Sequence, residues 1–233
     1  MQNKREALKA AFPHTIPVLT GYAFLGLAYG VLMSLRGFGV GWTAVISLCV
    51  FAGSMQYVGL TLLTASFSPV SALLMTLVVN ARHLFYGVSM LGRFRGTGKC
   101  KPFLIFGLTD ETFSILCSAE PPEGVDRNWF MCFVTLLDYI YWVSATILGA
   151  ALGGLITFET KGLDFVLTAL FVVIFLNQWR EQKQHLPALI GLGCSALCLL
   201  LFGADGFILP AMLSIVLVLT LLRRRLEKGE DAA

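Results

Sequence analysis

The stretch Asn80-Ala-Arg-His-Leu-Phe-Tyr-Gly87 places polar and charged side chains late in a long apolar segment. It follows 45 residues, Gly37 to Ala81, that contain no Asp, Glu, Lys or Arg. A charged side chain in hydrocarbon costs about 2.5–3.5 kcal/mol on insertion scales, so such a residue usually faces a cavity or a pathway. At helical spacing, one face of this stretch carries Asn80, His83, Tyr86 and Gly87, and Arg82 meets Tyr86 one turn on. The stretch therefore predicts a helix with a functional polar face inside a membrane.

The composition indicates the same class. Of 233 residues, 57% are hydrophobic and 13% charged, about half the charged fraction of soluble domains, and the mean hydropathy is +0.78. The net charge of +3 comes from clusters at segment ends, which gives no indication of nucleic-acid binding. Five of the six cysteines lie inside apolar runs, where a thiol acts as a small hydrophobe, and Cys100 alone is expected to contact water. The sequence predicts no disulfide framework, metal site or cofactor.

Apolar runs separated by turn residues predict an all-α polytopic membrane helix bundle of seven to eight segments. The expected segments are about 13–35, 41–66, 69–91, 102–118, 129–156, 163–179, 186–203 and 206–222. They form a single transmembrane domain, 13–222, between a basic cytoplasmic N-terminus, 1–12, and a basic, then acidic cytoplasmic tail, 223–233. The first run is too long for a signal peptide, and no small-residue cleavage site follows it. Within it, Gly26-x-x-x-Gly30 favours close packing of another helix over a broken helix.

The centre of the second segment, Phe51-Ala-Gly-Ser-Met-Gln-Tyr57, combines a flexible point with a polar amide. Two interpretations stay open. Gly53 and Ser54 form a tight helix crossing in which Gln56 bonds a neighbour, or they form an unwound turn that offers backbone groups to a substrate.

The fourth and fifth segments carry intramembrane carboxyl groups. Thr109-Asp-Glu-Thr112 lies in a 17-residue apolar run, and Asp138 lies one turn before Trp142. Burial disfavours a charged carboxylate and would allow proton exchange near neutral pH. The alternative is a structural ion pair of Arg82 with Asp110 or Glu111, which is compatible with function.

The charge pattern conflicts with eight full crossings. With the N-terminus inside, eight crossings put the basic loop 92–101 outside, against the positive-inside rule. If one early segment and the fourth turn back without crossing, the loop moves inside, which favours broken or re-entrant helices near Gly53 and Asp110. A shift of about 89 residues also lays 13–91 over 102–179, so the spacing motivates a 3+3 inverted repeat, although residue identity between the two is poor.

Three motifs resemble, in this order, the AzlC family: Phe51-Ala-Gly-Ser-Met-Gln56, Asn80-Ala-Arg-His-Leu-Phe-Tyr-Gly87 and Thr109-Asp-Glu-Thr-Phe113. Trp142 ahead of a Gly/Ala-rich helix also fits, and the resemblance covers about residues 10–222. It implies the large subunit of a bacterial branched-chain amino acid exporter in the cytoplasmic (inner) membrane. It also implies a small membrane partner of the AzlD type, and leucine, isoleucine, valine and sometimes methionine as substrates.

A zwitterionic amino acid needs a donor for its carboxylate, an acceptor for its ammonium group and an apolar pocket. Arg82 with broken-helix N–H groups meets the first need, and Asp110, Glu111 or backbone carbonyls meet the second. The expected substrate-binding residues are Ser54, Gln56, Asn80, Arg82, Tyr86, Thr109 and Trp142. Because no Gly-x-x-x-x-Gly-Lys-Ser/Thr sequence is present, we expect proton coupling as the energy source. Its candidates are His83, Asp110, Glu111 and Asp138.

Two other functions remain as alternatives. A passive pore or non-catalytic scaffold subunit would use the buried polar groups only for helix packing, and saturable exchange would distinguish it from a carrier. An intramembrane enzyme using His83 and a carboxylate is disfavoured, because the chain contains neither Gly-x-Ser-x-Gly nor His-Glu-x-x-His.

Overall fold

The computed structural model is helical and divides into two compact units, Met1–Val166 and Leu167–Ala233. Every regular element that it describes is a helix, which confirms the all-α class. Helices long and apolar enough to span a membrane cover Lys4–Leu35, Ala72–Met90, Arg127–Gly153 and Leu186–Gly203. The residues that the structure describes are 2–64, 69–155, 172, 175–176, 179–180, 185–207, 210–211, 213–215 and 217–222.

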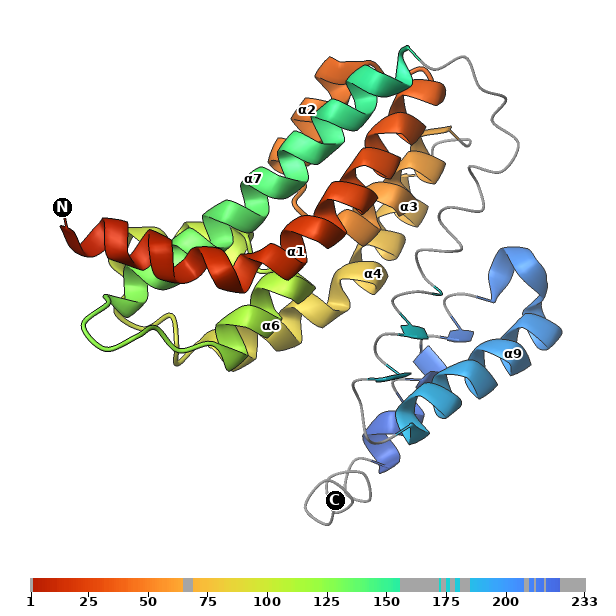
Figure 1. Cartoon of the computed structure of the whole chain (residues 1–233). Coiled ribbons are helices and arrows are strands. Elements are labelled where there is room, and N and C mark those ends of the chain that lie inside the picture. Colours follow the sequence, from red (N-terminus) through yellow and green to blue (C-terminus); the bar gives the residue numbers. More distant parts are fainter. Residues whose placement is uncertain are drawn as a thin grey trace. The chain divides into compact units, whose positions relative to one another are not determined.

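Two long helices, α1 (Gln2–Leu35) and α7 (Arg127–Gly153), lie side by side along the first unit (Figure 1). They run parallel, because His14 contacts Phe130 near one end and Gly153 faces Val31 near the other. At 1.5 Å per residue, the 34 residues of α1 exceed the roughly 30 Å of a hydrocarbon core. The helix begins well before the expected span at 13 and so carries the basic N-terminal residues on its first turns.

Small residues allow α1 and α7 to approach closely. A Cβ added at Gly30 would overlap the Thr146 carbonyl and the Ala150 amide of α7, and one at Gly26 would lie 2.7 Å from the Ala145 Cβ. The predicted close approach at Gly26 and Gly30 is therefore confirmed. α1 stays a single helix although it contains Pro13 and Pro17, and it bends along its length, as prolines inside a helix commonly cause (Figure 1).

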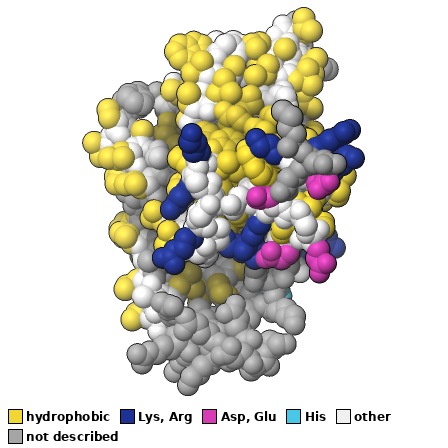
Figure 2. All heavy atoms as spheres, turned by 90° about the vertical axis from the view of Figure 1, so that its left-hand side faces the viewer, with side chains coloured by type: hydrophobic (Ala, Val, Ile, Leu, Met, Phe, Trp, Pro, Cys, Tyr) yellow, Lys and Arg dark blue, Asp and Glu magenta, His cyan; other side chains and the backbone are white. Residues whose placement is uncertain are grey.

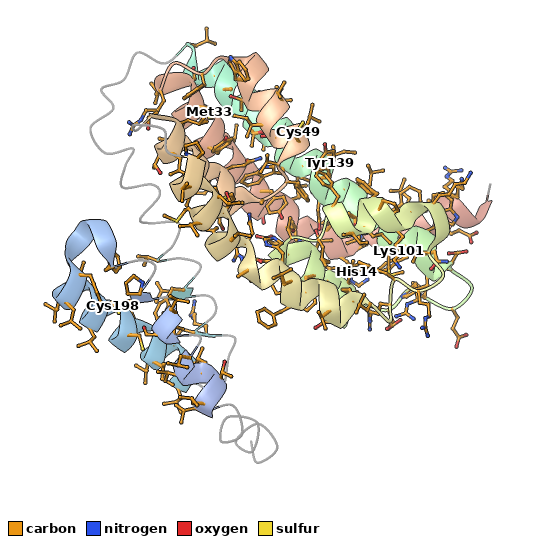
Figure 3. The ribbon with its side chains drawn as sticks, turned by 180° about the vertical axis from the view of Figure 1, so that it is seen from behind. His14, Met33, Cys49, Lys101, Tyr139 and Cys198 are labelled. Carbon is orange, nitrogen blue, oxygen red and sulfur yellow. The ribbon has the colours of Figure 1, made fainter. Side chains whose placement is uncertain are left out.

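The second expected segment is two short helices, α2 (Val40–Cys49) and α3 (Gly53–Thr64), joined by a break at 50–52. The end of α2 reaches the middle of α7, where Tyr139 donates a hydrogen bond to the Leu48 carbonyl. α3 then returns along α1, since Phe51 contacts Tyr22 whereas Tyr57 donates to the Leu25 carbonyl. In Figure 3, Cys49 and Tyr139 lie mid-way along the unit and Met33 lies near the end at which this hairpin opens.

The helix α4 (Pro69–Met90) runs the length of the unit and leads to a second hairpin. After the short 3-10 turn η1 (Gly98–Cys100), α5 (Lys101–Phe106) leads toward the first break and ends at a second break, 107–109. α6 (Asp110–Ser118) then runs back in the opposite direction. Phe106 contacts Phe51 at the other break, whereas Arg93 bonds the Leu116 carbonyl at the base. The fourth expected segment is thus also a broken hairpin, and it opens at the opposite end from the first.

The two hairpins place the basic loop beside the N-terminus. Phe94 packs in one core cluster with Ala11 and Phe130, and Asn128 donates to the Gly96 carbonyl. The Lys4 ammonium lies 3.9 Å from the Trp129 ring centroid. Figure 2 shows Lys and Arg side chains gathered with acidic ones on this face. The basic loop and the basic N-terminus therefore lie at the same end of the first unit, which removes the conflict that eight full crossings created with the positive-inside rule.

The second unit contains α9 (Leu186–Gly206), which is kinked at Gly203, where φ is +71°. Before it, Trp179 stacks on His185 with ring centroids 4.1 Å apart. The sixth expected segment, 163–179, lies mostly outside the described residues, and the tail 223–233 lies wholly outside them. The expected repeat stays a prediction, because 102–179 is only partly described; within the described part, α1 is continuous whereas 102–118 is broken.

Candidate functional site

The two helix breaks meet mid-way along α7. The Phe51 ring of the first break contacts Phe106 at 6.4 Å and Tyr139 at 5.2 Å between centroids. α3 and α6 both begin here, so the free N–H groups of two helix N-termini lie at this level. The Thr109 hydroxyl caps α6 by accepting from the Thr112 amide at 3.3 Å. Such breaks are the usual place for a substrate or ion site in membrane transport proteins.

Arg82 on α4 connects α3 and α6 at the level of the two breaks. One guanidinium nitrogen lies 2.5 Å from Asp110 Oδ2, and another donates to Ser54 Oγ at 2.8 Å. The ion pair anticipated for Arg82 is therefore made with Asp110, and both side chains remain about one third exposed. Arg82 Nε and Asp110 Oδ1 have no hydrogen-bond partner. Both atoms are buried, so the polar groups of this pair are not fully satisfied within the described part of the protein.

A second polar cluster lies deeper, among α1, α6 and α7. The Tyr22 hydroxyl lies 2.8 Å from Glu111 Oε2 and 2.9 Å from Thr109 Oγ1. Thr112 donates to Asp138 Oδ2 at 2.9 Å, and Asp138 is fully buried. The structure therefore brings the predicted Thr109, Glu111 and Asp138 together through Tyr22 and Thr112, two residues that were absent from the predicted site. A tyrosine inside the first apolar segment was the only sequence signal for Tyr22.

Gln56 and Trp142 hold the first break in place. The Gln56 amide donates to the Val50 carbonyl and accepts from the Trp142 indole N–H at 2.9 Å. A Cβ at Gly53 would lie 3.0 Å from the Trp142 ring, so only glycine fits there without a shift. Both interpretations of this stretch therefore hold in part: the helix is broken, and Gln56 bonds neighbouring groups.

A cavity of about 550 Å³ lies between α4 and α5, beside the first break. Its polar lining includes Asn80 and His83, with Lys101 among the residues around it, and the rest is mainly apolar. The Asn80 side-chain oxygen has no partner. Tyr86 does not line the cavity: its ring stacks on Phe113 with centroids 4.4 Å apart. The cavity is lined by Phe51, Ala52, Asn80, His83, Leu84, Gly87, Val88, Leu91, Phe94, Lys101, Ile105, Phe106 and Leu108.

Several known proteins are similar in sequence to this chain over most of its length. The family described as AzlC protein matches residues 17–156. The branched-chain amino acid transport protein AzlC of Bacillus subtilis is 53% identical over 232 residues, covering 98% of this chain and 91% of the relative. A membrane protein of Haemophilus influenzae is 41% identical, with 95% and 91% covered. The inner membrane protein YgaZ of Escherichia coli is 30% identical, with 76% of each chain covered.

No solved structure matches the chain. The names of the Haemophilus influenzae and Escherichia coli relatives describe membrane proteins, in agreement with the membrane-length apolar helices among the described residues. Since the family match spans more than half of the sequence and the identity extends over nearly all of it, the chain belongs to the AzlC family of membrane transport proteins.

Proposed function

We propose that the chain exports branched-chain amino acids across the bacterial cytoplasmic membrane, coupled to protons, as the large subunit of a two-component exporter. The observation that carries the proposal is the Arg82–Asp110 ion pair, which lies where two helix breaks meet and whose side chains remain about one third exposed. The similarity to the branched-chain amino acid transport protein of Bacillus subtilis supports the substrate class. Export and a small AzlD-type partner follow from the family resemblance alone.

A bound amino acid would divide its two charges between the members of this pair. Its carboxylate would accept hydrogen bonds from Arg82 and from the N-terminal N–H groups of α3, which carry positive partial charge. Its ammonium group would donate to Asp110. Its aliphatic side chain would contact the aromatic rings at the breaks, Phe51 and Phe106, which also line the cavity of about 550 Å³; Arg82 and Asp110 themselves do not line that cavity.

The other predicted binding residues take supporting places in this arrangement. Ser54 holds the second arm of the Arg82 guanidinium, and Thr109 caps the helix that carries Asp110. Asn80 and His83 provide the polar part of the cavity lining. Gln56 and Trp142 keep the break before α3 open, and Tyr86 packs behind the pair on Phe113.

The test is efflux of radiolabelled leucine from proteoliposomes, with and without the small partner and with and without a pH gradient. Asp110→Asn should abolish uphill efflux. Glu120→Gln is the matched control, since Glu120 pairs with Arg93 at 2.8 Å in another ion pair, away from the breaks. Saturable counterflow distinguishes a carrier from a passive pore. Efflux that ignores the gradient, with Asp110→Asn as active as the control, would refute the proposal.

A further inference from the structure

A continuous chain of hydrogen bonds connects two carboxyl groups across α6, α1 and α7. It begins at Glu111, whose Oε2 lies 2.8 Å from the Tyr22 hydroxyl, and Tyr22 lies 2.9 Å from Thr109 Oγ1. The Thr109 hydroxyl donates to Thr112 Oγ1 at 3.1 Å, and Thr112 donates to Asp138 Oδ2 at 2.9 Å. Only hydroxyl groups lie between the two carboxyls, and each of them is at most 6% exposed.

We propose that Glu111 and Asp138 are the two ends of a single proton-binding site, which holds one proton and transfers it between them through Tyr22, Thr109 and Thr112. This proposal rests on the function proposed above only in the coupling of the proton to amino acid transport. Intramembrane carboxyl groups joined by hydrogen-bonding side chains are the usual form of a proton relay.

The count of hydrogens supports one shared proton. The chain contains four hydrogen bonds, and each needs one hydrogen. Its three hydroxyl groups supply three, because a hydroxyl donates once and accepts up to twice. If both carboxyl groups are charged, one of the four hydrogen bonds lacks a hydrogen. If both are protonated, there are five hydrogens for four hydrogen bonds, and one hydrogen has no acceptor among these groups. One added proton satisfies every bond and lets all of them point the same way, an arrangement in which each bond strengthens the next.

Transfer along the chain is balanced in atoms and charge. A proton on Glu111 passes to the Tyr22 oxygen while the Tyr22 proton passes to Thr109. The Thr109 proton passes to Thr112, and the Thr112 proton passes to Asp138 Oδ2. The hydroxyl groups end neutral, as they began, and one negative charge has moved from Asp138 to Glu111.

The two ends differ in their neighbours, which gives the relay a direction. Glu111 lies in the first turn of α6, next to Asp110, whose side chain is about one third exposed. Asp138 is 0% exposed, and its Oδ1 has no partner. Glu111 is therefore the end that exchanges protons with the site, and Asp138 is the end that stores one.

The charges around Glu111 can couple the relay to a bound amino acid. Asp110 is its neighbour on α6, and α4 brings Arg82, His83 and Tyr86 to the same region. An ammonium group bound at Asp110 adds positive charge beside Glu111, and Coulomb attraction then favours the negative charge at Glu111 and the proton at Asp138. Release of the ligand returns the proton to Glu111.

The direct test is infrared titration of the protonated carboxyl groups in purified protein reconstituted in lipid. In wild-type protein the pair should take up one proton equivalent in a single step, and both Glu111→Gln and Asp138→Asn should alter the same carboxyl signal. Tyr22→Phe and Thr112→Val remove hydroxyls of the chain and should decouple the two ends. Independent uptake of two protons in wild-type protein, with the losses in the two carboxyl variants adding up to the wild-type signal, would overturn the proposal.

Two matched control residues belong to this protein but not to the hydrogen-bond chain. Tyr57→Phe removes a hydroxyl that donates to the Leu25 carbonyl, and Thr135→Val removes one that donates to the Met131 carbonyl of its own helix. Both side chains are fully buried, as Thr112 is. These variants should keep the wild-type infrared titration; a response equal to that of Tyr22→Phe or Thr112→Val also contradicts the relay.

Leucine transport measurements distinguish a failure of the proton relay from a failure of the proposed transport function. Tyr22→Phe should lower gradient-driven leucine efflux by roughly a hundredfold, the lower end of what a positioned proton-transfer group contributes, and should preserve leucine exchange at equal pH. If wild-type protein moves no leucine but shows the shared proton, the transport function fails and the relay stands. If leucine efflux follows the pH gradient but Tyr22→Phe behaves as Tyr57→Phe does, the relay fails and the function stands.

Discussion

Replacing Gly30 by alanine should destabilise the protein, because α1 and α7 are in backbone contact at that position. The added Cβ would overlap the Thr146 carbonyl and the Ala150 amide and would lie 2.8 Å from the Gly149 carbonyl carbon. All three obstacles are backbone atoms, which cannot rotate away, so the helices must separate. Overpacking costs about 1–3 kcal/mol, and rigid obstacles place this site at the upper end.

The net effect includes the intrinsic helix preference of alanine, which offsets about 1 kcal/mol of that cost. Gly30→Ala should therefore lose about 2 kcal/mol, which lowers the melting temperature by about 4–8 °C for a chain of this length. Gly21→Ala is the matched control in the same helix, because a Cβ there has no atom within 4 Å. It should gain about 1 kcal/mol from helix preference alone.

The assay is thermal unfolding of the purified protein in detergent, followed by helical circular dichroism. The two variants should shift in opposite directions. If Gly30→Ala melts at or above the wild-type temperature, as Gly21→Ala is expected to, then α1 and α7 do not pack as closely as described. The site built across their interface, including the contact of Tyr22 with Trp142 at 5.1 Å between centroids, would then need revision.

Three further predictions follow from the site. Trp142→Phe leaves the buried Gln56 oxygen without its donor, which should cost about 1–3 kcal/mol of stability and lower leucine counterflow, measured on the same preparation. Arg82→Lys keeps the charge but loses the planar two-armed donor; leucine affinity should fall about ten- to hundredfold in counterflow, and unchanged affinity would exclude Arg82 as the carboxylate donor. In protein that retains only Cys100, an impermeant maleimide should react from the same membrane side as in a cysteine-free protein carrying Lys4→Cys; reaction from opposite sides would contradict the hairpin topology.

Local chemistry alone located most of the polar site. Charge in an apolar run is costly wherever the run lies, so Arg82, Asp110, Glu111 and Asp138 could be singled out without knowledge of their neighbours. The same argument does not apply to Tyr22, because a tyrosine is tolerated inside a membrane helix and carries no charge to mark it. Nor could it choose whether Arg82 pairs with Asp110 or Glu111, since both carboxyls lie within one turn.

Composition and periodicity by themselves determined that the chain is a helical membrane protein, because the transfer of side chains into hydrocarbon depends on their chemistry and not on their partners, and the charge pattern favoured breaks near Gly53 and Asp110. The structure has the breaks beside these two residues, and tertiary structure alone decided that 41–66 and 102–118 turn back instead of crossing. A short helix that turns back inside the membrane has the same local composition as one half of a helix that crosses it completely. They differ only in what holds the broken backbone in place, and that depends on distant residues: Trp142, which bonds Gln56 at the first break, and Thr135, which packs against Gly107 at the second.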